Sequence, residues 1–168
     1  MSKHIFLFLS LCIMISGCIK NKGIGDELEP GDFLPDFSVM MSDGSLMTDD
    51  LLKGKVSFVM FFHTECKDCQ KTLPIVQKIY DEYKAENVLF VLISREEEKD
   101  KIETYWKENG LDMAFSAQND RSVYELFAQS RIPRIYINDR NGIIRNVFTD
   151  DPVPSYSDLK VAVESLIR

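Results

Sequence analysis

A pair of cysteines separated by two residues, placed just after a strongly apolar segment, constrains this chain more than any other feature. Val56–Phe62 is almost continuously apolar and rich in residues that favour strands, which is typical of a strand buried on both faces of a sheet. Cys66 and Cys69 follow, and apolar residues then recur at three- and four-residue spacing to about residue 85, which predicts an amphipathic helix. The cysteine pair is therefore expected where a buried strand gives way to a helix.

The rest of the pattern alternates strands with helices, which predicts an α/β domain with a mixed sheet. Asp43-Gly44 and Asn141-Gly142 suit the backbone angles of tight turns, so each is expected to close a β-hairpin. Gly110 is expected to end a helix. The remaining predicted elements are strands at Phe37–Met40, Ser45–Thr48, Val88–Ile93, Ile135–Ile137 and Ile143–Phe148, and helices at about 96–109, 120–129 and 156–167.

The N-terminus has the features of a targeting segment. Lys3 and the apolar run Ile5–Ile15 match a secretory signal and are too short for a transmembrane helix. The sequence Ile15-Ser16-Gly17-Cys18 resembles the lipobox of bacterial lipoproteins, which implies removal of residues 1–17 and lipidation of Cys18. An ordinary signal peptide with an incidental Cys18 is the alternative. Residues 18–29 are then expected to form a lipidated, flexible tether, followed by one domain over 30–168.

Composition limits the possible partners. The chain has 168 residues, of which 45% are apolar and 28% charged, as in a folded domain and unlike a disordered chain. Acidic residues outnumber basic ones by 27 to 20, for a formal net charge of -7. Binding to nucleic acid depends on clustered Lys and Arg, so we exclude a nucleic-acid partner.

The remaining cysteines favour redox chemistry. Cys12 lies in the predicted signal and Cys18 would hold lipid, so Cys66 and Cys69 are the only thiols expected in the domain. A disulfide that closes so short a loop stabilises a fold little. At a helix N-terminus, free N–H groups and the macrodipole would stabilise a Cys66 thiolate. We therefore predict Cys66 as the attacking thiol and Cys69, one turn later, as the resolving thiol.

Several motifs resemble those of thioredoxin-fold proteins, and in particular of the membrane-anchored periplasmic branch typified by TlpA and ResA. They are Cys66-Lys67-Asp68-Cys69 after a strand, Pro74 five residues after the second cysteine, Ile132-Pro133 before a hairpin, Pro35-Asp36-Phe37, Asp43-Gly44 and Leu52-Lys53-Gly54-Lys55. The resemblance covers roughly residues 30–168. It implies a thioredoxin-like fold, with a central mixed β-sheet flanked by helices and an N-terminal β-hairpin extension.

The resemblance also implies a function. It implies thiol–disulfide oxidoreductase activity in the bacterial cell envelope, with a reductant role favoured and with no cofactor beyond the redox-active disulfide Cys66–Cys69. The expected partners are protein thiols and disulfides, an upstream electron donor, and a membrane reached through the lipid anchor, on the periplasmic side or at the outer membrane.

The same resemblance implies a substrate-binding loop. Pro133 should follow a cis peptide bond and face the cysteine pair, leaving the Ile132 backbone free to pair with substrate. A proline that simply starts a strand is the alternative. Arg134 is expected either to hold an acidic substrate segment or to be a solvated strand residue.

This chain departs from the family at its acidic positions. Thioredoxins place a proton-transferring acid six positions before the first cysteine, where Met60 stands, and ResA-like members place one three positions after the second, where Thr72 stands. Without either acid we expect a slower resolving step.

Other charged groups near the pair have opposing effects. Lys67 favours a Cys66 thiolate, whereas Glu65 and Asp68 oppose it. His63 is expected either to tune the pair or to be an ordinary polar loop residue. The charged run Glu96–Lys101 is interpreted as the solvated start of a helix.

Three alternatives remain open at this point. A peroxiredoxin-like peroxidase would have Thr or Ser three residues before its reactive cysteine, where this chain has His63. A zinc site needs about four ligands, and Cys66, Cys69 and His63 are the only candidates, so no metal site is predicted. A thioredoxin-like lipoprotein that acts mainly as a partner-binding module is the third alternative.

Overall fold

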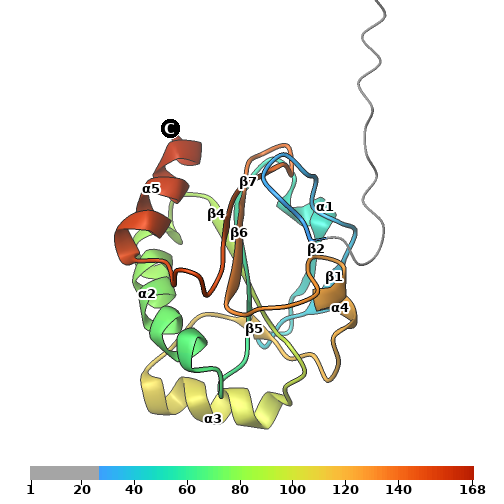
Figure 1. The fold of residues 1–168 in the computed structure, drawn as a ribbon, viewed down its shortest axis with the longest axis vertical. Coiled ribbons are helices and arrows are strands. Elements are labelled where there is room, and N and C mark those ends of the chain that lie inside the picture. Colours follow the sequence, from blue (N-terminus) through green and yellow to red (C-terminus); the bar gives the residue numbers. More distant parts are fainter. Residues whose placement is uncertain (1–26) are drawn as a thin grey trace, which may run out of the picture.

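The computed structural model describes residues 27–168 (Figure 1). Five strands form a central sheet in the order β5-β4-β3-β6-β7, and β1 and β2 form a separate antiparallel pair. The strands are β1 Ser38–Met40, β2 Leu46–Thr48, β3 Val56–Phe62, β4 Val88–Ser94, β5 Phe115–Ser116, β6 Arg134–Asn138 and β7 Ile144–Phe148. The helices are α1 Asp49–Leu52, α2 Lys67–Tyr83, α3 Lys99–Asn109, α4 Ser122–Glu125 and α5 Tyr156–Ile167.

Strand β3 is the centre of the fold, and all seven of its residues are buried. It pairs in parallel with β4 along its whole length and antiparallel with β6, which makes the sheet mixed. Parallel strands need a crossover connection, and α2 supplies it. The carboxyl ends of β3 and β4 therefore meet at one edge, where the Arg95 N–H donates to the Phe62 carbonyl at 2.8 Å.

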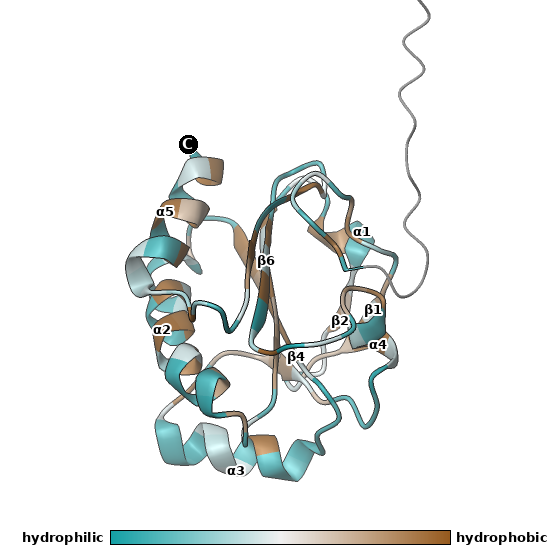
Figure 2. Ribbon diagram, viewed as in Figure 1, coloured by the Kyte–Doolittle hydropathy of each residue, from teal (hydrophilic) through white to brown (hydrophobic). Residues whose placement is uncertain are grey.

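Helices cover the sheet on both faces. Figure 1 shows α2 and α5 on one face, and β1, β2, α1 and α4 on the other. Helix α3 runs across the end of the sheet at which α2 begins. Most of α3 is hydrophilic, whereas the central strands include long hydrophobic stretches (Figure 2). The N-terminus of α2 and the polar helix α3 thus frame one end of the molecule.

Most predicted elements are confirmed, and two helices differ from expectation. Helix α3 begins at Lys99 rather than near residue 96, because Glu96 has a left-handed φ of 61° that a helix does not accept. Helix α4 ends at Glu125 rather than near residue 129. The Phe127 and Ala128 N–H groups share the Tyr124 carbonyl, so the chain tightens into a turn there.

The last residues of the expected tether belong to the folded domain. The Leu28 side chain is buried, and its N–H donates to the Phe127 carbonyl at 3.0 Å. The expected boundary at residue 30 is therefore too late by at least two residues. The predicted signal and Cys18 lie outside the described residues. Within residues 27–168, no helix has the length and apolarity needed to cross a membrane.

Candidate redox site

Cys66 caps the N-terminus of α2. Its backbone is extended, and its sulfur accepts a hydrogen bond from the Cys69 N–H at 3.3 Å. The Cys66 thiol in turn donates to the Ile132 carbonyl at 3.4 Å. A sulfur in this position lies among unpaired helix N–H groups, which favour negative charge. Cys66 is partly exposed and its thiol is free.

Cys69 lies one turn into α2 and is fully buried. Burial raises the pKa of its thiol far above the usual range, and the side-chain interaction of this thiol with the Cys66 sulfur raises it further. The His63 backbone N–H and the Arg95 cation partly oppose this pKa shift. Of the two thiols, only Cys66 is positioned to meet a substrate first, while Cys69 stays protonated beneath it.

The loop before β6 lies against the cysteine pair. The Ile132–Pro133 peptide bond is cis, and Pro133 is buried. Because the Ile132 carbonyl accepts the Cys66 thiol, this loop is in direct contact with the sulfur. The cis bond and the closeness to the pair agree with what the family resemblance implied. A second cis bond, Asp151–Pro152, lies outside this site and was not anticipated.

Arg134 differs from both sequence-based expectations. It is 4% exposed, so it is not a solvated strand residue. Its guanidinium donates to the two carboxylate oxygens of Glu27 at 3.1 and 3.0 Å and to the Ser130 carbonyl at 3.1 Å. Burial opposes the charge, but the Glu27 carboxylate raises the Arg134 pKa overall. Arg134 therefore links the N-terminal segment to β6, and its charge is paired with the Glu27 carboxylate within the protein.

The four predicted tuning residues occupy different positions. His63 lies at the end of β3, where its carbonyl accepts the Cys66 N–H at 3.1 Å and its Nδ1 accepts the Glu65 N–H at 3.1 Å. Glu65 and Lys67 are exposed on either side of Cys66. Asp68 forms an ion pair with Lys71 at 2.7 Å, on the surface of α2. Only His63 and Glu65 take part in the loop that presents the Cys66 sulfur.

Glu97 is a buried carboxylate that the sequence interpretation missed. It is 3% exposed, so the prediction that the whole run 96–101 is solvated is wrong at this position. The Thr64 N–H donates to Glu97 Oε2 at 2.9 Å, and the Thr64 hydroxyl donates to Oε1. Glu97 Oε1 also lies 3.7 Å from His63 Nδ1. Glu97 thus holds the backbone two residues before Cys66.

The two positions that lack the family acids are packed without a carboxylate. Met60 is fully buried in β3, and the buried Thr72 hydroxyl donates to the Asp68 carbonyl at 2.7 Å.

Two other groups interact electrostatically with the buried Cys69 thiol. Arg95 lowers its pKa, while burial raises the Tyr105 pKa and the Cys69 charge adds to that effect. No sequence pattern indicated either residue as part of the site, because both lie far from the cysteine motif in sequence.

The fold and this site together define a class. A C-x-x-C pair at the start of a helix, next to a cis-proline loop on a sheet of order β5-β4-β3-β6-β7, is the arrangement of thioredoxin-fold thiol–disulfide oxidoreductases. Such a pair can exchange two electrons with another disulfide. The chain belongs to the AhpC/TSA family, whose model matches residues 30–147.

Known proteins agree with this class. Thiol-disulfide oxidoreductase ResA of Bacillus subtilis is 23% identical over 138 residues, which cover 80% of this chain and 77% of that protein. The thioredoxin domain of a thiol-disulfide oxidoreductase from Bacteroides vulgatus matches 84% of this chain and 100% of its own, with a TM-score of 0.73 at 21% identity. A thiol:disulfide interchange protein from Chlorobium tepidum covers 85% and 100%, with a TM-score of 0.71 at 22% identity. The protein is accordingly a thiol–disulfide oxidoreductase with a TlpA/ResA-like fold.

Proposed function

We propose that this protein reduces disulfides of other proteins in the bacterial cell envelope, with Cys66 as the attacking thiol and Cys69 as the resolving thiol. The single observation that supports this assignment is the asymmetry of the pair. Cys66 is partly exposed at the N-cap of α2, whereas Cys69, one turn further along the helix, is fully buried. An upstream electron donor must then reduce the pair again after each cycle.

The proposed reaction has two exchange steps. The Cys66 thiolate attacks a substrate disulfide, so that one Cys66–substrate S–S bond forms, the substrate S–S bond breaks, and the departing sulfur takes a proton. Cys69 then loses its proton and attacks the Cys66 sulfur, which forms the Cys66–Cys69 disulfide and releases the second substrate thiol. Two electrons pass from the pair to the substrate. The backbone next to Pro133 is the proposed docking segment for the substrate chain.

The reduction potential of the pair tests this proposal. Protein that starts after Cys18 is equilibrated with redox buffers of glutathione or dithiothreitol, and its free thiols are counted at each ambient redox potential. A reversible two-electron couple near or below about -220 mV is expected for a reductant. A value near about -120 mV would instead indicate an oxidant. The absence of any reversible Cys66–Cys69 couple would favour a partner-binding role.

Membrane attachment through Cys18 is the second part of the proposal. Its support is the apolar run followed by Ile15-Ser16-Gly17-Cys18. We expect the full chain expressed in a bacterial host to fractionate with membranes and to incorporate a labelled fatty acid. Cys18→Ser should lose both the label and the membrane association, while Cys12→Ser should keep both. Labelling of the Cys18→Ser protein would contradict the anchor.

A further inference from the structure

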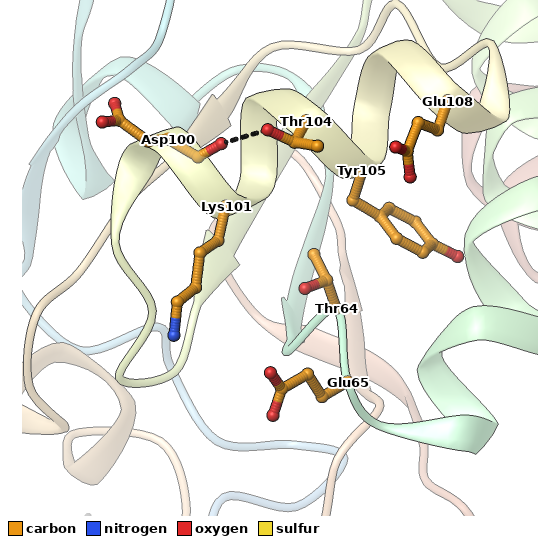
Figure 3. A pocket seen from close by; sticks show the side chains of 7 residues that line it. All are labelled: Thr64, Glu65, Asp100, Lys101, Thr104, Tyr105 and Glu108. Carbon is orange, nitrogen blue, oxygen red and sulfur yellow. Dashed lines mark hydrogen bonds between the residues drawn. The ribbon is translucent and has the colours of Figure 1, made fainter.

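The proposed docking segment is the backbone of residues 130–132, which leads into Pro133, and it is contacted from helix α4. The loop before Cys66 borders an open pocket, but the residues that line this pocket come from that loop and from α3 (Figure 3). The contact with the docking segment is instead made by Tyr124 of α4. The position of the segment relative to the attacking sulfur therefore depends on this tyrosine.

The Tyr124 hydroxyl reaches two carbonyls of the docking segment. It lies 2.5 Å from the carbonyl of Ser130 and 2.8 Å from that of Arg131, and its single proton can be donated to either. Burial raises the pKa of Tyr124, so the hydroxyl keeps this proton and remains a donor. The next carbonyl, that of Ile132, accepts the Cys66 thiol at 3.4 Å. Tyr124 therefore bonds the backbone directly beside the carbonyl that the attacking cysteine contacts.

The Tyr124 ring connects the docking segment to the strand that leads to the cysteines. Tyr124 is 1% exposed, and its ring packs edge-on against Phe61 of β3, with ring centroids 5.3 Å apart. The guanidinium groups of Arg95 and Arg121 each lie 5.4 Å from the centroid of the same ring, within the range of a cation–π interaction. Because β3 ends four residues before Cys66, a ring fixed on β3 holds the docking segment at a set place relative to the attacking sulfur.

The docking segment contains a strained residue that needs such a contact. Arg131 has a left-handed φ of 68°, which costs a residue other than glycine free energy. A residue keeps this conformation where the contacts around it enforce it. The Arg134 guanidinium donates to the neighbouring Ser130 carbonyl at 3.1 Å, whereas the Tyr124 hydroxyl also reaches the carbonyl of Arg131. Tyr124 thus bonds the strained residue itself.

We propose that Tyr124 is a positioning residue for substrate docking, and that its hydroxyl keeps the backbone before Pro133 in the conformation with which an extended polypeptide pairs beside Cys66. The inference rests on the proposed reductase function and deepens it, because it makes the docking segment favour substrates that have a peptide backbone. A small disulfide without a backbone meets the Cys66 sulfur directly and gains nothing from this contact. The hydroxyl itself takes no part in the sulfur exchange.

Tyr124→Phe tests the inference, because it removes the hydroxyl and keeps the ring. The reduced full chain is mixed with a peptide that contains one internal disulfide, or with hydroxyethyl disulfide, which is small and neutral, and a second-order rate constant is measured for each. We expect the ratio of the peptide constant to the hydroxyethyl disulfide constant to fall roughly tenfold, the effect of about one hydrogen bond. Both constants scale with the fraction of folded protein, so a loss of stability does not change their ratio. An unchanged ratio would overturn the inference.

A second buried tyrosine provides the matched control. Tyr136 is fully buried, and its hydroxyl donates to the Phe127 carbonyl at 3.0 Å, outside the docking segment. Tyr136→Phe should therefore leave the ratio unchanged. Incorporation of 4-aminophenylalanine in place of Tyr124 supplies an N–H donor at the same ring position and should restore most of the ratio. An equal fall of the ratio in Tyr136→Phe, or no recovery with the amino group, would contradict a positioning role for the Tyr124 hydroxyl.

The two substrates also separate this inference from the proposed function. If the unsubstituted protein fails to reduce hydroxyethyl disulfide, the proposed reductase function itself fails. If it reduces hydroxyethyl disulfide and Tyr124→Phe leaves the ratio unchanged, only the role assigned to Tyr124 fails.

Discussion

Cys69→Ser should convert the protein into a trap that stays joined to its substrates through Cys66. Attack by the sulfur of the partly exposed Cys66 does not need Cys69, but release of the mixed disulfide does. Multiple turnover should fall at least about a hundredfold, because each molecule stops after one attack. Non-reducing electrophoresis and mass spectrometry of the adducts measure this directly, with dithiothreitol releasing the trapped partner.

The matched variant and the pH dependence of the parent complete this test. Cys66→Ser removes the sulfur of the partly exposed cysteine and should form no adducts, since Cys69 is fully buried. Adducts through Cys69 would reverse the assignment of the two thiols.

In the unsubstituted protein, release of the substrate from the mixed disulfide should accelerate with pH. Burial raises the pKa of Cys69, so its reactive thiolate fraction grows about tenfold per pH unit below that pKa. A release rate that is flat from pH 7 to 9 would show that Cys69 deprotonation does not limit this step.

Sequence patterns predicted an element correctly where the residues of that element alone determine its structure. The almost continuous apolar run of β3 has no helical period, so its predicted bounds match the structure. Helix α5 also matches over Tyr156–Ile167, because Ser155 and Asp158 form a capping box that fixes its first residue. The left-handed Gly110 ends α3 as its sequence position indicated. In each case the signal lies within a few residues of the feature that it predicts.

The parts of the site that were missed depend on contacts between distant segments. Glu97 is one of three consecutive glutamates, and nothing in the run marks the middle one as buried. Its burial follows from the approach of the loops after β3 and β4, which brings Thr64 to its carboxylate. Arg134 is buried because Glu27, more than a hundred residues away in sequence, supplies a counter-charge. From sequence alone, a charged residue is assigned to the solvent-exposed surface. A charge pattern along the chain therefore does not reveal a buried residue whose partner is distant in sequence.

Glu97→Ala should lower the free energy of unfolding by about 3 kcal/mol. The substitution leaves the buried Thr64 N–H and hydroxyl without their carboxylate acceptor, and hydrogen bonds to charged groups contribute about 1.5–3 kcal/mol each. Such a loss is a large fraction of the stability of a typical domain. Urea unfolding of the reduced protein, analysed with a common slope, measures the change.

Conservative and neighbouring variants separate the loss of this contact from a general effect of charge. Glu97→Gln keeps an acceptor for Thr64 and should recover most of the stability, and with it the rate at which Cys66 attacks hydroxyethyl disulfide. Glu96→Gln and Glu98→Gln remove the same charge from exposed neighbours and should change stability by less than about 0.5 kcal/mol. If Glu97→Ala is as mild as these controls, then Glu97 does not hold the loop before Cys66. If it is severe while Glu97→Gln is not, a hydrogen bond from a segment more than thirty residues away keeps the attacking sulfur in place, and this bond matters more than the carboxylate charge.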